Sequence, residues 1–142
     1  MNKPHEDIEL RIRTLRTLWF ALSMSIVLYY AFTYMVTSPV RPNQTLSLVL
    51  LAVSVSTVLI AFVIKAKLLN LASERRQVPL IQQAYVVTWA ITEVGALLGL
   101  LDYFITGNPY FFVLFLIAAG GMLLHFPRRA HVLNAAFKDS AF

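Results

Sequence analysis

Residues 79–109 read PLIQQAYVVTWAITEVGALLGLLDYFITGNP, and this stretch decides the fold. It is long and apolar enough to form a helix across a lipid bilayer, which takes about 20 residues. Glu93 lies near its middle, and a proline stands at each end. We expect the other segments of the chain to form the scaffold around this helix.

The composition of the 142-residue chain is typical of a membrane protein. Hydrophobic residues make up 58% and charged residues 13%, whereas soluble domains contain about 25% charged residues. The apolar residues are concentrated in four stretches of a length that can span a bilayer. The predicted spans are residues 17–36, 45–64, 80–105 and 110–126, which form a single polytopic domain over residues 1–142.

The distribution of lysine and arginine predicts how these spans are oriented. Four precede the first span, four lie between the second and third, and three follow the fourth, while Arg41 is alone in the first link and the third link has none. The positive-inside rule then places both termini and the middle link in the cytoplasm. The predicted fold is an all-α bundle of four transmembrane helices, N-in and C-in, in the bacterial inner membrane.

Two of the spans are predicted to continue as helices into the cytoplasm. Ile8, Ile12, Leu15 and Trp19 lie on one helical face, and no glycine or proline interrupts residues 5–38. We therefore expect one continuous helix there, and the alternative is a separate amphipathic helix at the membrane surface. The second span is likewise expected to continue to about residue 77.

Several functional classes are not supported by the sequence. The chain has no cysteine, which excludes disulfides and thiolate metal sites. Its net charge is +5, but the basic residues flank apolar spans, so we expect the lipid bilayer and not nucleic acid as the partner. No metal-ligand cluster, nucleophile constellation or phosphate-binding loop is present, and we expect neither enzyme activity nor a cofactor.

Glu93 is the strongest candidate for a functional residue. A carboxyl group at mid-membrane is costly, and such residues commonly mark ion or proton pathways. Because neighbouring spans run in opposite directions, Ser25, Ser54 and Ser56 fall near the same depth as Glu93. The predicted ion- or proton-binding residues are Glu93, Ser54 and Ser56. The alternative is a neutral carboxyl that only hydrogen-bonds one helix to another.

The same stretch carries small residues at helical spacing, namely Thr88, Thr92, Gly95 and Gly99. The last two form a GxxxG pattern, which permits close approach between helices. We interpret these four as helix-packing residues, either against another span of this chain or in self-association. A homo-oligomer or a membrane-protein partner is expected.

Two further titratable residues lie near the ends of the predicted spans. Asp102 is near the outer end of the third span, where we expect it to reach water. His125 is near the inner end of the fourth span. At about 1.5 Å per residue, it lies roughly 16 Å in depth from Glu93, too far for a direct pair.

The central hairpin of the chain, residues 52–101, resembles subunit c of the rotary ATP synthases. The residues that carry the likeness are Arg76-Gln77-Val78-Pro79, Leu80, Ile81, Ala90, Glu93 and Gly99-Leu100. The resemblance implies that Glu93 binds and releases a proton, since Val94 stands where sodium-binding versions place a hydroxyl. As a whole, the chain also resembles small four-helix membrane proteins of bacteria.

These patterns predict a small integral membrane protein in which Glu93 has an ion- or proton-linked role within an oligomer. A second hypothesis is a structural or accessory subunit of a membrane complex, with no transport activity of its own. A third is a protein that binds a lipid or small molecule between its helices.

Overall fold

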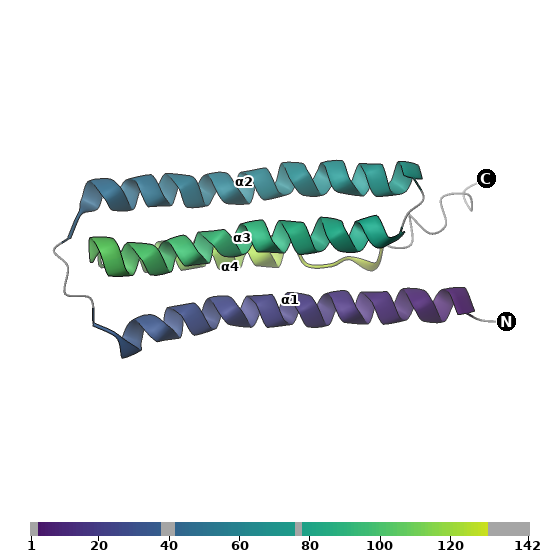
Figure 1. Cartoon of the computed structure of the whole chain (residues 1–142), viewed down its shortest axis with the longest axis horizontal. Coiled ribbons are helices and arrows are strands. Elements are labelled where there is room, and N and C mark those ends of the chain that lie inside the picture. The colour runs from purple at the N-terminus through teal and green to yellow at the C-terminus, as the bar shows by residue number, and fades with distance from the viewer. Residues whose placement is uncertain (1–2, 38–41, 76–77, 131–142) are drawn as a thin grey trace.

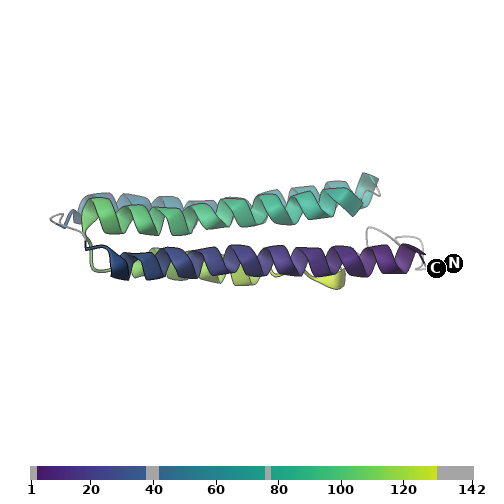
Figure 2. The ribbon, with the colours of Figure 1, turned by 60° about the horizontal axis from the view of Figure 1, so that its bottom comes forward.

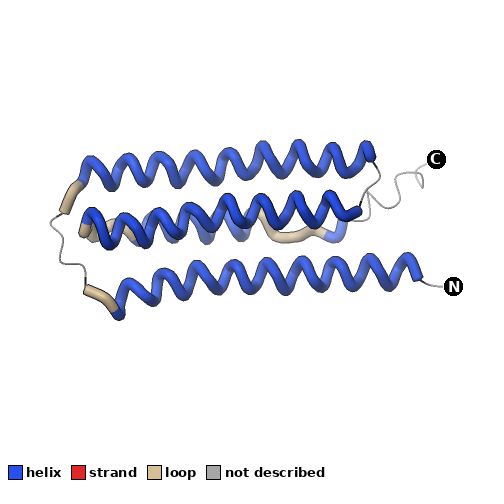
Figure 3. Tube along the Cα trace, viewed as in Figure 1, coloured by secondary structure: helices blue, strands red, loops and turns tan. Residues whose placement is uncertain are grey.

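The computed structural model describes residues 3–37, 42–75 and 78–130, and all regular structure in these ranges is α-helical. The helices are α1 (Lys3–Met35), α2 (Gln44–Arg75), α3 (Val78–Thr106) and α4 (Phe112–Leu124). They lie alongside one another in an elongated bundle (Figures 1 and 3). Three of them, α1, α2 and α3, are long and apolar enough to cross a membrane. Arg41, Arg76 and Gln77 lie outside the described residues.

The two longest helices confirm the prediction that helix continues beyond the apolar spans. α1 runs unbroken through the charged N-terminal segment, where Ile8, Ile12 and Leu15 are buried. α2 continues in the same way to Arg75. In α1 and α2, the only proline is in the first turn of α1, where it is tolerated. No proline therefore interrupts the backbone hydrogen bonds of these two helices. A separate amphipathic N-terminal helix is thereby excluded.

α3 is the central helix of the bundle. It contacts each of the other three helices, whereas α1 and α2 do not contact each other within the described residues. Figure 1 shows α1, α3 and α2 in a row, with α4 behind α3, and Figure 2 shows the same bundle turned by 60°. The three largest fully buried side chains among the described residues all belong to α3, namely Trp89, Tyr85 and Ile81. The stretch quoted at the outset therefore organises the fold.

α3 ends at a turn that its sequence explains. Gly107 has a φ of 58°, the left-handed conformation that glycine adopts readily just after a helix. Asn108 Oδ1 then accepts a hydrogen bond from the Tyr110 N–H (3.0 Å). The chain reverses here and enters α4. The prediction of a helix over residues 80–105, followed by a turn, is confirmed.

α4 corrects the predicted fourth span. The expected helix covered residues 110–126, but α4 has 13 residues, which at 1.5 Å each give a length of about 20 Å. A bilayer core is about 30 Å thick. Pro127 explains the early end, because proline disfavours helical geometry in the residue before it. His125 to Arg128 continue as a non-helical segment.

Candidate functional site

Glu93 lies at the contact between α3 and α1. Its Oε1 accepts hydrogen bonds from Ser25 Oγ (2.6 Å) and from the Tyr29 hydroxyl (3.1 Å), both on α1. The side chain is half-buried, and none of the ion pairs found among the described residues involves it. A mid-helix carboxyl is thus held by hydroxyl groups and not by a cation.

The Ser25 hydroxyl has two acceptors within reach. Its Oγ lies 2.6 Å from Glu93 Oε1 and 2.7 Å from the Leu22 carbonyl oxygen. A serine hydroxyl has one proton to donate, together with lone pairs that accept. When Glu93 is ionised, Ser25 can donate to it. When Glu93 is protonated, the carboxyl can donate to Ser25 while Ser25 donates to Leu22, so both protonation states find a partner.

The structure brings only one of the three expected serines to Glu93. Ser25 bonds to it as described, but Ser54 and Ser56 do not. A Cβ built at Gly95 would lie 3.0 Å from Ser54 Oγ, and residues two apart on a helix point about 200° away from each other. Ser54 therefore lies on the side of α3 opposite Glu93. Ser56 is exposed and donates to the Ala52 carbonyl (2.8 Å).

Tyr29 is a site residue that the sequence analysis did not identify. A signal for it was present. Ser25 and Tyr29 are four residues apart, and residues at that spacing are neighbours on a helix surface. A serine at the depth of Glu93 therefore brings Tyr29 within reach of the same carboxyl.

The small residues of α3 pack inside the molecule. Thr88 and Thr92 are fully buried, and their hydroxyls donate to the Ala84 and Thr88 carbonyls (2.6 and 2.9 Å). Gly95 and Gly99 are buried too. A Cβ at Gly95 would meet Ala118 of α4 at 3.5 Å, and one at Gly99 would meet Phe115 at 3.0 Å. This face is covered by α2 and α4, so it is not open to a second copy.

Asp102 is fully buried, which corrects the expectation that it reaches water. It faces α2, and its carboxyl accepts hydrogen bonds from Ser47 Oγ (2.9 Å) and Thr106 Oγ1 (2.6 Å). Asn108 Nδ2 in turn donates to Ser47 Oγ (2.6 Å). This polar cluster, Ser47, Asp102, Thr106 and Asn108, joins the start of α2 to the turn between α3 and α4.

Side chains from α1 and α3 bond the backbone where α4 ends. Both tryptophans of the chain take part: Trp19 Nε1 donates to the Met122 carbonyl (2.9 Å), and Trp89 Nε1 donates to the His125 carbonyl (3.0 Å). The Arg128 N–H donates to the Tyr85 hydroxyl (3.1 Å). Unsatisfied backbone groups are costly in lipid, and irregular backbone is tolerated there only inside protein. These bonds make a short α4 possible.

We expect the Trp89→Phe substitution to destabilise the protein by about 1–3 kcal/mol, the cost of a buried polar group that loses its partner. The Trp19→Phe substitution should cost less, because the Met122 carbonyl also accepts from the His125 N–H (3.2 Å). Unfolding in detergent, followed by circular dichroism, measures both free energies. Equal losses for the two variants would contradict this account.

Comparison with known proteins adds no assignment to this geometry. Within the described residues, no three His, Asp or Glu side chains form a group that could hold a metal ion. The chain matches no protein-family model, no curated protein and no solved structure. The resemblance to subunit c stays a prediction that rests on the residues quoted for it.

Proposed function

We propose that this chain is a multi-pass protein of the bacterial inner membrane, with both termini in the cytoplasm, in which Glu93 takes up and releases a proton. The length and apolar character of α1, α2 and α3 support the membrane placement, and the distribution of basic residues supports the orientation. The homo-oligomer or membrane-protein partner expected from the sequence remains part of the proposal.

The observation that carries the proposal is the position of Ser25 between Glu93 and the Leu22 carbonyl. A residue that only joins two helices needs one stable protonation state. Ser25 instead offers a donor to the carboxylate and an acceptor to the protonated acid, at 2.6 Å from Oε1. Because Tyr29 donates to the same oxygen, the charged form keeps two hydrogen bonds in an apolar setting.

Proton exchange at Glu93 can be tested by labelling with a hydrophobic carbodiimide, which reacts with protonated carboxyl groups. We expect labelling of Glu93 to fall as the pH rises. In the Ser25→Ala variant, Glu93 loses this partner in both protonation states, and the bond to the charged form is the stronger of the two. Labelling should therefore persist to higher pH than in the unsubstituted protein.

Ser23→Ala is the matched control, because Ser23 donates to the Trp19 carbonyl (2.8 Å) and not to Glu93. Its labelling midpoint should equal that of the unsubstituted protein. Labelling of Glu93 that does not change with pH would reject proton exchange and favour the second hypothesis, a structural or accessory subunit in which Glu93 only joins α1 to α3. The hydrogen bonds between these two helices are the observation that favours that hypothesis.

A further inference from the structure

Basic side chains converge where α4 ends. Lys65 of α2 places its Nζ 3.5 Å from His125 Nδ1 and 4.8 Å from the centre of the Tyr85 ring. Arg128 follows three residues after His125, and its backbone bonds to Tyr85. Burial, and to a lesser extent the positive charge of Arg128, lower the pKa of Lys65. We call Lys65, His125 and Arg128 the basic cluster.

The contacts of Lys65 hold its ammonium group in one place. His125 is fully buried and packs on Phe62 with ring centres 4.4 Å apart, which fixes the position of its ring beside Lys65. The Tyr85 ring attracts the same cation through its π face. An ammonium group has three N–H donors. With one directed to His125, two remain for an acceptor from outside.

The positive charge of the cluster is not balanced by the described part of the protein. There, neither Lys65 nor Arg128 forms a salt bridge, and the nearby Arg129 is paired with Glu9 of α1 (2.6 Å). The carbonyl end of α4 contributes a negative charge of about one half. Two full positive charges exceed it, so this site attracts an anion.

We propose that Lys65 and Arg128 bind the phosphate group of an anionic phospholipid at the end of α4. This proposal rests on the membrane placement proposed above but not on proton exchange at Glu93. The cluster lies in the half of the bundle where α1 begins and the basic residues are concentrated. Basic pockets between transmembrane helices on the cytoplasmic side are suited to anionic headgroups. The guanidinium group of Arg128 suits phosphate geometrically.

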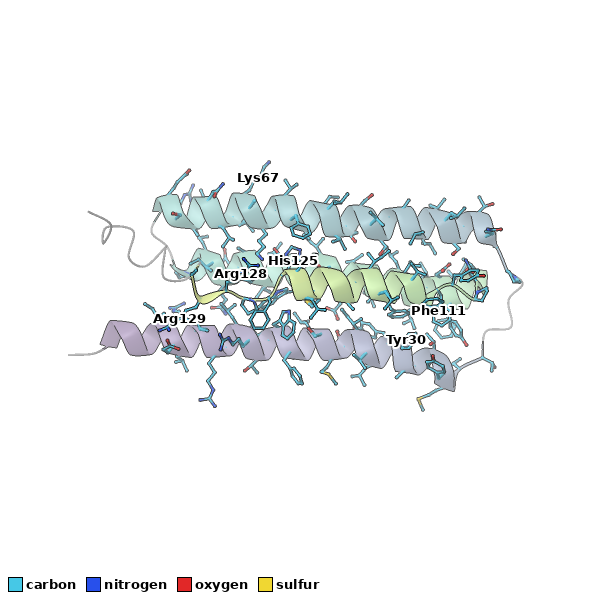
Figure 4. The ribbon with its side chains drawn as sticks, turned by 180° about the vertical axis from the view of Figure 1, so that it is seen from behind. Tyr30, Lys67, Phe111, His125, Arg128 and Arg129 are labelled. Carbon is cyan, nitrogen blue, oxygen red and sulfur yellow. The ribbon has the colours of Figure 1, made fainter. Side chains whose placement is uncertain are left out.

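Lys67 provides a matched control on the same helix. It is exposed, and Figure 4 shows its side chain pointing away from the bundle, whereas His125 and Arg128 lie between α2 and α1 at the end of α4. Lys65 and Lys67 are two residues apart in the sequence, and substitution of either by glutamine removes one positive charge. The two variants differ in whether the lost charge belonged to the cluster.

The test measures binding of phosphatidylglycerol and phosphatidylcholine to the full chain in detergent by native mass spectrometry. We expect Lys65→Gln and Arg128→Gln each to weaken phosphatidylglycerol binding about five-fold, the effect of one basic residue near a membrane surface. Lys67→Gln should leave it unchanged. Phosphatidylcholine should bind more weakly and respond to none of the three substitutions.

Other outcomes would overturn the proposal. Equal losses of phosphatidylglycerol binding in Lys65→Gln and Lys67→Gln would mean that the lipid is attracted by the overall positive charge and not by a specific site. Displacement of the lipid by millimolar inorganic phosphate would identify a free anion as the ligand in place of a lipid. Arg128 is exposed, so Arg128→Gln is expected to fold even if Lys65→Gln does not. Glu93→Gln should bind lipid normally, which separates failure of this site from failure of proton exchange.

Discussion

Substitution of Gly121 by alanine is expected to destabilise the protein by about 1–3 kcal/mol, the usual cost of overpacking a well-packed interior. A Cβ at this position would lie 2.9 Å from Thr92 Cγ2 and 3.2 Å from Val58 Cγ2. Both neighbours are β-branched, so their χ1 angles are restricted. Thr92 is also fully buried. Neither methyl group can rotate away, and α4 must shift from α2 and α3. Unfolding in detergent, followed by circular dichroism, measures the loss.

The adjacent Gly120 is the control for this prediction. A Cβ at Gly120 would meet no atom within 4 Å, so Gly120→Ala should not destabilise the protein and should add about 0.5–1 kcal/mol to the free energy of unfolding through the helix propensity of alanine. Both glycines lie in α4 and gain the same helix propensity from alanine. The difference between the variants therefore isolates the contact with Thr92 and Val58. Equal effects would show that α4 does not pack closely there.

The second large effect is expected for Asp102→Ala, which should cost about 1–3 kcal/mol, the penalty for leaving a buried hydrogen-bonding group without its partner. Ser47 loses its acceptor, and the Thr106 hydroxyl can then donate only to the backbone carbonyl of residue 102 (2.8 Å). The start of α2 is then held to the turn before α4 by fewer bonds. Hydrogen exchange should be faster at the Asn43 N–H, which donates to the Thr106 carbonyl (2.9 Å).

Glu74→Ala is the control for the loss of a carboxyl group, because Glu74 is exposed on α2. Surface substitutions of this kind change stability by about 0.5 kcal/mol or less. A cavity of about 130 Å³ reaches Ser47 and Asn108, next to Asp102. If water in this cavity replaced the lost carboxyl, Asp102→Ala would be as mild as Glu74→Ala. That result would contradict the structural role assigned to Asp102.

The three long helices were predictable because their signal is local. Each is an apolar stretch in which no interior glycine or proline breaks the helix. The turn at Gly107 is encoded in a few neighbouring residues. Helices satisfy their own backbone, so length and hydropathy suffice to find them. α3 could likewise be recognised as central, because it alone combined a mid-helix carboxyl with small residues at helical spacing.

Local signals predict the short α4 only in part. Pro127 limits where the helix can end, but an end at Leu124 also needs partners for the backbone groups that leave the helix. Its end depends on bonds between distant residues, such as that from Trp19 to Met122, which are 103 positions apart. A hydropathy count includes the apolar residues up to Phe126. It does not detect that tryptophan side chains donate hydrogen bonds to the carbonyl groups where α4 ends. The fourth helix was therefore expected to be longer than it is.

The candidate site was predictable in its centre but not in its surroundings. Glu93 is identified by its charge alone, and depth counting places Ser25 beside it. Depth counting cannot tell which side of α3 a residue faces. Ser54 shares the depth of Glu93 but lies across the helix, and Asp102 faces α2 instead of water. The rotation of each helix about its axis is set by packing that only the assembled bundle shows.

The length of α4 has a consequence for the lipid around the protein. In the proposed placement, α1 and α2 match a full bilayer, whereas α4 falls short of it by about 10 Å. A bilayer thins beside a short hydrophobic surface, at a fraction of a kcal/mol per Å of mismatch. The hydrophobic surface that faces lipid is therefore thicker at α1 and α2 than at α4. Membrane proteins with a similarly short hydrophobic surface would associate beside α4. Hydrophobic mismatch therefore favours association at one side of the molecule.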